Sequence, residues 1–552
     1  MLCVARRMWL LLALSVLFSS APTWAGSSEP IPLGLGTEGK TLTTLHFGAN
    51  VEYHRPGVFY GTLPPGDPRS TRRAFLASLR ENGPRSLRFA GGNCSYWYLY
   101  DSEDVTRELT SRLGLGTYAP QSFQNAYFTR LDDFLQFCRD SGIEPVVQLP
   151  TMFYNDFGVP RTVLESSYSR RAPDLYDRDR VDEAAAYVGG LVAWTRALGF
   201  RVRHWELGNE EFAHFDVDAY MRIATAYAKA VKRECPDAVL YAPVMNWADE
   251  LLPRMGEAGF GASNLRLTTH YPFGNWFLQP SDVDVADPAN YLMADMDFAK
   301  NFAATRAGLA RRGWAGASIA VTETSVIRFP ADGEHSWDPF AIIPSFAHAL
   351  AFADNWASLI AQPDCVAATF HDLESTYFGL TKFDVYYDRE RRRFAWIPPD
   401  WQERPATIEP ECWFKGRYVP SPTCFAMGML GELVGSRLVP VTVRGDGAPP
   451  MPDTARFLAG RDAHRLTLVA LNRGDSALCF RLDTGDSCPE SRTFKGRLLT
   501  ADSLRSVLPH EIHCQDVEVP GPNPDMEIPP YSLVVITRRT PWRRENEGGT
   551  TE

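Results

Sequence analysis

Two glutamates, each at the end of a strand-like run, are the residues of this chain best suited to chemistry. Glu210 closes the run 203–210, and Glu323 lies near the end of the run 319–324. Strand and helix signals alternate between them, as in a barrel whose parallel strands end at one face. Retaining glycoside hydrolysis requires one carboxyl that protonates a leaving oxygen and a second that attacks an anomeric carbon. The pair therefore predicts two strands of one barrel that face a common cleft.

The elements that must position this pair form a regular series between His46 and about Val434. Short apolar runs alternate with amphipathic helical stretches, which is the pattern of a parallel α/β fold. The predicted strands are 45–51, 86–89, 145–149, 202–208, 239–243, 265–271, 318–322 and 367–371. The clearest predicted helices are 129–140, 181–198, 217–233, 345–359 and 425–434. Eight such strands predict an α/β fold of the (β/α)8 TIM-barrel type, over residues 40–437.

The pattern changes after Val439, where strands such as 466–472 and 532–536 follow one another without helices. This predicts an additional C-terminal antiparallel β-sandwich over residues 438–539, which the segment 28–39 could join. The polar tail 540–552 is expected to be disordered.

The segment 373–422, after the last predicted barrel strand, is rich in proline, aromatic and charged residues. It would lie on the face where the active sites of such barrels are found. It is either a surface loop held by a disulfide or one wall of the substrate cleft.

The N-terminus reads as an export signal. Arg6 and Arg7 precede the apolar run 8–18, and Ala25 ends a small-residue cleavage site. Residues 1–25 are therefore predicted to be a signal peptide, and the mature protein to be secreted or periplasmic. The apolar run is shorter than the roughly 17 residues that a membrane span needs. No other stretch is long and uncharged enough, so no membrane span is expected.

The charge of the chain argues against a nucleic-acid partner. The net charge is −11 at pH 7, and no long basic run interrupts the acidity. The same acidity argues against tight binding to sulfated polymers through overall charge, although it leaves room for a local basic groove. The sequence carries no signal of an oligomeric state.

Ten cysteines, one of them in the signal segment, suggest an oxidising compartment in which some would pair. No Cys-x-x-Cys spacing occurs, so neither a zinc site nor a redox motif is predicted, and no cofactor is expected. The candidates for disulfide bonds are Cys412, Cys424, Cys479, Cys488 and Cys514, whereas Cys138, Cys235 and Cys365 are expected to be buried thiols.

Three motifs resemble those of clan A retaining glycoside hydrolases. The hexapeptide Trp205-Glu206-Leu207-Gly208-Asn209-Glu210 is similar to their acid/base motif at the end of barrel strand 4. Thr322-Glu323-Thr324-Ser325 is similar to their nucleophile motif at the end of strand 7, and the segment 87–93 resembles their strand-2 loop. The resemblance is closest to family 79, the heparanase and β-glucuronidase group, with family 51, the α-L-arabinofuranosidases, as the alternative. Both families combine a barrel with a β-sandwich.

The resemblance implies a role for four residues. Glu210 would be the general acid and then the base, and Glu323 the nucleophile. Arg88 would keep the nucleophile ionised through a charge-assisted hydrogen bond. Asn209 would bind the sugar 2-hydroxyl, a contact that strengthens in the transition state.

Five further residues belong to the site region. Tyr271 matches a strand-6 tyrosine of the family, and the neighbouring His270 is either a substrate contact or a core histidine. Asn93, formally in a glycosylation sequon, is interpreted as a cleft residue. Glu206 is expected to be a buried carboxylate paired with an arginine. His371 ends the eighth predicted strand and could face the cleft.

The resulting hypothesis is an exported retaining glycoside hydrolase with an oligosaccharide or polysaccharide substrate. The resemblance to family 79 favours β-linked glycosides that contain uronic acid. An α-L-arabinofuranosidase would use the same glutamates, and a non-catalytic carbohydrate-binding protein is the alternative from another class. Two carboxylates and water complete the chemistry, so neither metal nor cofactor is implied.

Overall fold

The structure is a computed structural model of the whole chain. It describes residues 29–37, 39–52, 79–91, 131–151, 181–213, 215–244, 248–270, 277–278, 288–293, 297–325, 329–330, 343–374, 379–398, 400–484, 493–521 and 523–539. The predicted signal peptide (1–25) and the predicted tail (540–552) lie outside these residues.

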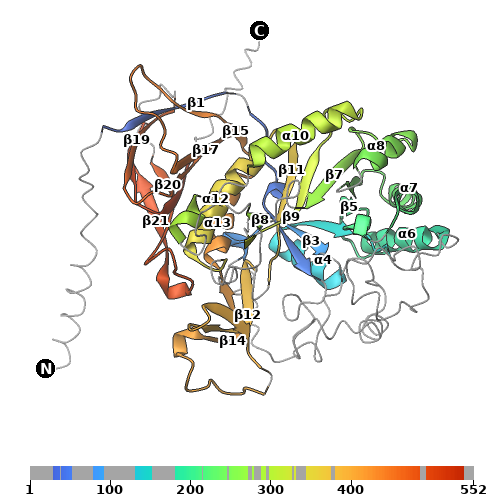
Figure 1. The fold of residues 1–552 in the computed structure, drawn as a ribbon, viewed down its shortest axis with the longest axis horizontal. Coiled ribbons are helices and arrows are strands. Elements are labelled where there is room, and N and C mark those ends of the chain that lie inside the picture. The colour runs from blue at the N-terminus through green and yellow to red at the C-terminus, as the bar shows by residue number, and fades with distance from the viewer. Residues whose placement is uncertain are drawn as a thin grey trace, which may run out of the picture.

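Eight parallel strands close into a barrel in the order β11-β2-β3-β4-β5-β6-β7-β9 (Figure 1). They are β2 (Gly48–Glu52), β3 (Ser86–Ala90), β4 (Glu144–Gln148), β5 (His204–Glu206), β6 (Val239–Pro243), β7 (Leu265–His270), β9 (Ile319–Thr324) and β11 (Cys365–Phe370). Each corresponds to one predicted strand, so the predicted (β/α)8 fold is confirmed. The first strand begins later than predicted because the 3-10 helix η1 (Thr44–His46) precedes it.

Helices pack around the outside of the barrel (Figure 1). They are α4 (Leu131–Ser141), α6 (Val181–Ala197), α7 (Val217–Glu234), α8 (Ala248–Glu257), α9 (Pro288–Leu292), α10 (Phe298–Arg311), α12 (Phe346–Ile360) and α13 (Pro422–Leu430). Side-chain caps fix where three of them begin, since Asp216, Ser345 and Ser421 each accept a hydrogen bond from the first turn of α7, α12 and α13.

The barrel strands place alternate residues on opposite sides, which determines what enters the barrel interior. An inner cluster of Leu45, Val146, Tyr241, Ala320 and Ala367 fills the barrel. The intervening strand residues, such as Leu87, Phe89 and Trp205, pack outward against the helices. Arg88 lies between Leu87 and Phe89 and therefore points inward. The same alternation brings Gln148 and Glu206 into the interior.

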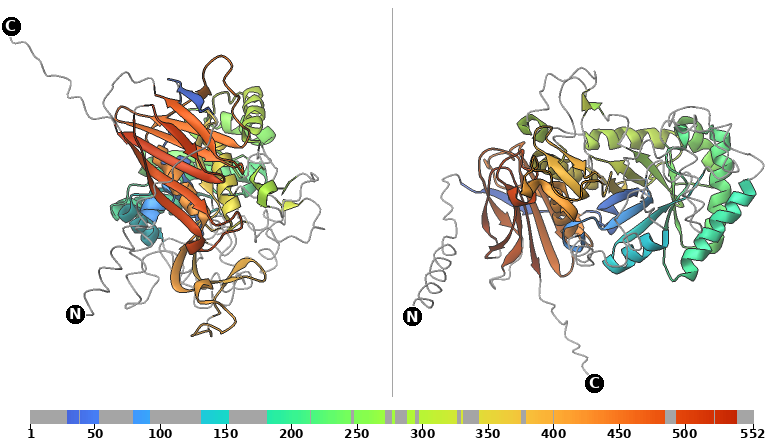
Figure 2. Two further views of the ribbon diagram at one scale, coloured as in Figure 1. Left: turned by 90° about the vertical axis from the view of Figure 1, so that its left-hand side faces the viewer. Right: turned by 90° about the horizontal axis from the view of Figure 1, so that it is seen from below.

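A β-sandwich follows the barrel, as predicted (Figure 2). A six-stranded sheet in the order β15-β17-β18-β23-β20-β21 faces a four-stranded sheet in the order β16-β1-β19-β22. The pairings are antiparallel except that between β1 and β19. The strands are β1 (Ile31–Leu35), β15 (Arg437–Val439), β16 (Val441–Val443), β17 (Ala455–Arg461), β18 (Arg465–Asn472), β19 (Leu478–Asp483), β20 (Phe494–Ala501), β21 (Ile512–Val519), β22 (Asp525–Ile528) and β23 (Ser532–Arg539).

The central strands β18 and β23 of the six-stranded sheet are buried on both faces because the sheet also packs against the barrel. Leu468 and Ile536 belong to the sandwich core, whereas Val469 and Val535 belong to the core of the barrel. Between the two domains, the Asp354 side chain of α12 is 2% exposed and forms ion pairs with Arg456 and Arg473 of the sandwich. The sandwich therefore supports the barrel from the side of α12 and α13.

Much of the segment 373–422 forms strands, which contradicts its interpretation as a disulfide-held surface loop, whereas its interpretation as one wall of the substrate cleft stays a prediction. Strands β12 (Thr381–Asp388), β13 (Arg393–Trp396) and β14 (Trp413–Pro420) form an antiparallel sheet in the order β13-β12-β14. Its buried face has a small core that includes Val385 and Phe414. The alternation of apolar and polar residues in β12 is what allows one face to be buried.

The expected disulfides are not found among the cysteines that the structure describes, which are all free thiols. Cys412 lies in the core of the β12–β14 sheet, whereas Cys424 lies in α13 and its thiol donates to the Asn82 carbonyl. Cys479 and Cys514 are on strands of different sheets, β19 and β21. These four cysteines thus lie in separate packing environments, and Cys488, the fifth candidate, lies outside the described residues.

Two very short strands, β8 (Phe277–Leu278) and β10 (Phe329–Pro330), pair in parallel outside the main sheets. No helix within the described part of the chain is long and apolar enough to cross a membrane.

Candidate active site

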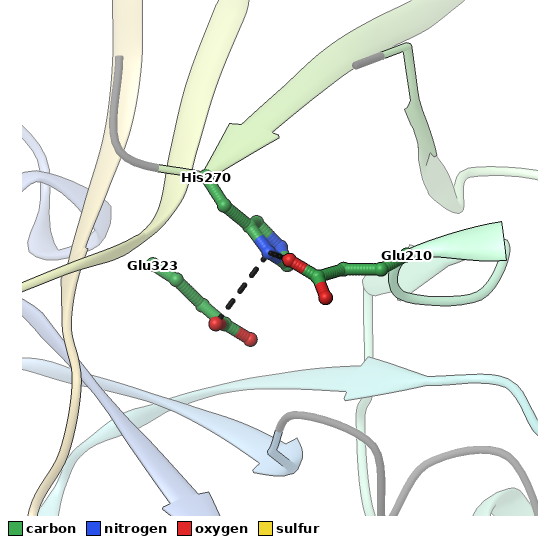
Figure 3. A group of neighbouring side chains, drawn as sticks. All are labelled: Glu210, His270 and Glu323. Atoms are coloured by element: carbon green, nitrogen blue, oxygen red, sulfur yellow. Dashed lines mark hydrogen bonds and ion pairs between the residues drawn. The ribbon is translucent and has the colours of Figure 1, made fainter. Parts of the chain in front are cut away.

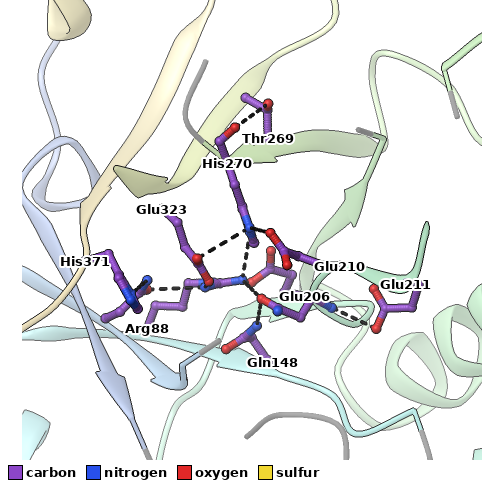
Figure 4. A network of polar contacts seen from close by, with 11 residues as sticks. Arg88, Gln148, Glu206, Glu210, Glu211, Thr269, His270, Glu323 and His371 are labelled. Atoms are coloured by element: carbon purple, nitrogen blue, oxygen red, sulfur yellow. Dashed lines mark hydrogen bonds and ion pairs between the residues drawn. The ribbon is translucent and has the colours of Figure 1, made fainter. Parts of the chain in front are cut away.

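Arg88, on β3, is the centre of a buried polar network inside the barrel (Figure 4). Its Nε donates to Glu206 at 2.5 Å and its Nη1 donates to Glu323 at 2.8 Å. Nη2 donates to Asn209 Oδ1 at 2.8 Å, and Nη1 also reaches Asn50 at 3.3 Å. The guanidinium is 1% exposed. One arginine thus fixes side chains from β5, β9 and the turn after β5, and Glu206 is the arginine-paired carboxylate that was predicted.

Glu323 reaches the interior because β9 contains a β-bulge. Val321 pairs with Thr269 of β7, but the next pair joins Glu323 to His270, so Thr322 is an extra residue on β9. The pairing with β11 is shifted over the same part of β9. Ala320 points into the barrel, so strict alternation would turn Thr322 inward and Glu323 outward. The bulge reverses this and aims the Glu323 carboxylate at Arg88.

Glu210 and Glu323 approach each other on either side of His270 (Figure 3). The His270 Nδ1 lies 2.7 Å from Glu210 Oε1 and 3.5 Å from Glu323 Oε2. One oxygen of each carboxylate and a ring nitrogen of His270 all lie within 4.8 Å of one another. Carboxyl groups of retaining glycosidases are about 5–5.5 Å apart, and those of inverting enzymes about 6.5–9.5 Å apart. The two carboxylates are therefore closer than inverting enzymes need and lie on the retaining side of these two ranges.

Electrostatics keep Glu323 ionised. Burial alone would raise the pKa of its carboxyl, but the nearby charges of His270, His371 and Arg88 outweigh this and hold the pKa below its usual value. For His270, burial would lower the pKa, yet Glu323 and Glu210 raise it above the usual value. The Glu323 carboxylate is thus available as an anion, which is the form a nucleophile needs.

The Asn209 side chain is fixed through its amide oxygen, Oδ1, which leaves its amide nitrogen, Nδ2, as a donor for a ligand. Oδ1 accepts from Arg88 Nη2 and from Gln148 Nε2 at 3.0 Å. Nδ2 is buried and has no hydrogen-bond partner among the described residues. A buried donor of this kind favours a ligand acceptor, because leaving it unpaired costs about 1–3 kcal/mol.

The network brings together five predicted site residues: Arg88, Asn209, Glu210, His270 and Glu323. Asn93 and Tyr271 lie outside the described residues. His371, at the end of β11, has its Nδ1 3.2 Å from Asn50 Nδ2 and lies on the Glu323 side of the network (Figure 4).

Glu211 is a member of the site that the sequence analysis missed. Its carboxyl is fully buried, and Oε1 accepts from the Asn209 backbone N–H at 2.8 Å and from Thr151 Oγ1 at 3.1 Å. Burial raises the pKa of Glu211 to about 8, although these hydrogen bonds oppose the rise. The only signal in the sequence was a second acid directly after Glu210, which looks like a solvated pair.

Glu210, His270 and Glu323 also have the donor types of a cation site. A ring nitrogen that carries a proton cannot bind a metal, and the raised pKa of His270 favours the protonated ring. Arg88 already neutralises Glu323. The donor set therefore fits a proton-carrying network better than a metal ligand set.

Replacing Arg88 with methionine is expected to destabilise the fold by about 3–5 kcal/mol, because Glu206 and Glu323 would lose their buried counter-charge. Urea unfolding measures the change. Arg481→Met is the control, since its ion pair with Asp525 is exposed on both sides and is worth at most about 1 kcal/mol. Equal losses for the two variants would contradict the role given to Arg88.

The buried Glu211 carboxyl is expected to make stability depend on pH. The folded chain keeps this proton up to about pH 8, whereas the unfolded chain loses it near pH 4.3. The folded state thus binds more protons across this window, so the free energy of unfolding falls as pH rises through it. Glu211→Gln removes the effect. Its stability relative to wild type should rise steadily from pH 4.5 to pH 8, and parallel stability curves would argue against a buried neutral carboxyl.

Comparison with solved structures shows that the barrel and sandwich form a known fold. The chain is similar to the GH51 arabinofuranosidase from Xanthomonas axonopodis pv. citri, with a TM-score of 0.60 and 15% identity over 92% of this chain and 100% of that one. An α-L-arabinofuranosidase from Thermotoga maritima, solved with arabinose, gives a TM-score of 0.59 and 15% identity over the same shares. A glucosidase from Croceicoccus marinus gives 0.52 and 13% over 93% of this chain and 100% of that one.

These identities are low, so the similarity establishes the fold and not the activity. No family model matches the sequence, and no curated protein matches it. The resemblance of the sequence to clan A enzymes thus agrees with the fold of solved glycoside hydrolases.

Proposed function

We propose that this protein is a retaining glycoside hydrolase. The observation that carries the proposal is the spacing of Glu210, in the turn after β5, and Glu323, near the end of β9, whose nearest carboxylate oxygens are within 4.8 Å of each other. A general acid and a nucleophile at this spacing can act on the same glycosidic bond without room for an intervening water.

The surroundings of the two glutamates indicate which is the nucleophile and which is the general acid. Glu323 is held ionised by Arg88 and the neighbouring histidines, so it is the nucleophile. The Glu210 side chain is 20% exposed, against 7% for Glu323, and is the one that a proton from solvent can reach. Glu210 is therefore the acid.

The reaction then has two steps. A Glu323 oxygen attacks the anomeric carbon while the bond to the leaving oxygen breaks, and Glu210 gives that oxygen its proton. Water next attacks the glycosyl–enzyme ester, and Glu210 takes up the proton that the water loses. The sugar leaves with its original anomeric configuration, and both glutamates return to their starting forms.

The Asn209 amide has a place in this scheme. Its Nδ2 group is a donor without a partner among the described residues, next to both glutamates in the network of Arg88. It would donate to the sugar 2-hydroxyl, where a hydrogen bond gains strength as positive charge develops on the sugar ring.

The sugar is proposed to be α-L-arabinofuranose rather than a uronic acid. Nearly the whole chain shares its fold with arabinofuranosidases. The Arg88 guanidinium is fully used by Glu206, Glu323 and Asn209, so it is not available to bind the carboxylate of a uronic acid. These two observations move the preference from the family 79 substrate to the family 51 substrate. Export from the cell stays a prediction from the sequence.

The test is hydrolysis of 4-nitrophenyl glycosides by the purified mature protein, with the α-L-arabinofuranoside, the β-D-glucuronide and the β-D-glucoside compared. Release from the arabinofuranoside is expected, and Glu323→Ala is the blank. Release from the glucuronide alone would restore the family 79 substrate. Binding of arabinose oligosaccharides without release from any substrate would favour the carbohydrate-binding protein.

A further inference from the structure

The turn that carries Asn209 and Glu210 is built around the carboxyl of Glu211. The turn follows β5, and Glu211 begins the 3-10 helix η7 (Glu211–Ala213) directly after it. The carboxyl folds back under the turn, where Oε1 accepts the Asn209 backbone N–H at 2.8 Å and the Thr151 hydroxyl at 3.1 Å. Thr151 comes from the segment after β4, so the contact ties the turn to the neighbouring strand.

Gly208 shows how closely the carboxyl fits. It has a φ of 104°, which residues with a Cβ rarely adopt, and a Cβ built there would lie 2.0 Å from Glu211 Oε1. The backbone of the turn thus has a conformation that leaves room for one carboxyl directly beneath it. This packing is specific to the position and chemistry of residue 211.

The charged and titratable groups around Glu211 favour its neutral form. Glu206 lies on β5, and Tyr220 of α7, whose hydroxyl donates to the Leu207 carbonyl, interacts electrostatically with Glu211. Glu210 is the next residue along the chain. The described contacts of the Glu211 carboxyl are with a backbone N–H and a hydroxyl, neither of which supplies a positive charge. A charged carboxylate here would therefore face two other acids without a described counter-ion.

We propose that Glu211 is a positioning residue, whose carboxyl holds the Asn209 backbone so that the Asn209 amide meets the substrate in register. The proposal rests on the glycosidase function proposed above. Glu211 touches neither Arg88 nor Glu323 in the described contacts, so it acts through Asn209. Its loss should reduce kcat rather than raise KM, since the Asn209 contact gains strength mainly in the transition state.

The experiment is a double-mutant cycle on the purified mature protein, with kcat and KM measured for Glu211→Ala, Asn209→Ala and the double variant. Glu211→Ala is expected to lower kcat by up to about 10²-fold, the cost of a small misplacement of reacting groups, with KM changed by less than about threefold. The double variant should be within about twofold of Asn209→Ala alone, because both changes remove one function. A kcat loss in the double variant equal to the product of the two single losses would overturn the proposal.

Glu211→Gln tests the neutral form, since it keeps the acceptor oxygen for Asn209 and Thr151. It is expected to recover most of the activity lost in Glu211→Ala. A Gln variant as poor as the Ala variant would contradict a neutral carboxyl. Asp354→Asn is the control for a change at a buried acid, because Asp354 lies between the two domains, away from the network. It should lower the melting temperature and leave kcat unchanged.

A crystal structure of Glu211→Ala gives a readout that needs no activity. The Asn209 amide is expected to leave Arg88 Nη2, to which it is bonded at 2.8 Å in the wild-type chain. An unchanged Asn209 contact would overturn the proposal even if the protein cleaved no glycoside. Failure of the wild-type protein to cleave any substrate, with Asn209 displaced in the variant, would reject the glycosidase function alone.

Discussion

Replacing Glu323 with alanine is expected to abolish turnover, with a loss in kcat of about 10⁴-fold or more on every glycoside that the protein cleaves. The reason is that no other described carboxylate lies where Glu323 does, in contact with Arg88 and within 4.8 Å of Glu210 and His270. Initial rates with an aryl glycoside measure the loss. Near-wild-type activity of the Glu323→Ala variant would contradict the role of Glu323 as the nucleophile.

A small anion offers a sharper form of the same experiment. Azide can enter the space left by the missing Glu323 carboxylate and attack the anomeric carbon directly. The product should be a glycosyl azide of inverted configuration, since only one displacement takes place. Glu323→Gln is the matched control, because its amide still fills the space and should respond less to azide. Lack of rescue together with full folding would count against Glu323 as the nucleophile.

Replacing Glu210 with alanine is the second large expected effect. The loss should be roughly 10²–10⁴-fold in kcat/KM for substrates whose leaving group needs a proton. It should be smaller for a 2,4-dinitrophenyl glycoside, whose leaving oxygen needs no protonation. Comparing the two substrates in one variant cancels any general damage to the fold. Equal losses on both would indicate that Glu210 is structural, through its contact with His270.

The sequence predicted the barrel well because its strands are short apolar runs with clear breaks between them. The strand at 239–243 is found at Val239–Pro243, and the others differ by a few residues at their ends. The strand before Glu210 is shorter than predicted, since β5 ends at Glu206 and the turn begins at once. Local pattern therefore locates the strands, while their ends depend on the turn that follows.

The direction in which Glu323 points could not be predicted from periodicity. Ala320 faces the barrel interior, and simple alternation would have turned Glu323 away from Arg88. The bulge at Thr322 is visible only in the pairing with β7 and β11. The motif resemblance, and not the periodicity, singled out Glu323, and the bulge explains how its carboxylate comes to face Arg88.

Other features depend on contacts between distant parts of the chain. The burial of Glu211 requires Thr151 from the segment after β4, which no local pattern around residue 211 reveals. The β12–β14 sheet was not predicted, because its strands are separated by charged and proline-rich segments. Its core includes Val507 from the sandwich domain. Long-range contacts of this kind cannot be predicted from the local patterns of one sequence.

Double displacement by Glu210 and Glu323 fixes the stereochemistry of the first-formed product. Proton NMR during hydrolysis of the aryl glycoside that the protein cleaves follows the anomeric signal before mutarotation. Retention of configuration is predicted, because two successive displacements restore the starting configuration. Inversion would contradict the account and would mean that a water, not Glu323, attacks the sugar.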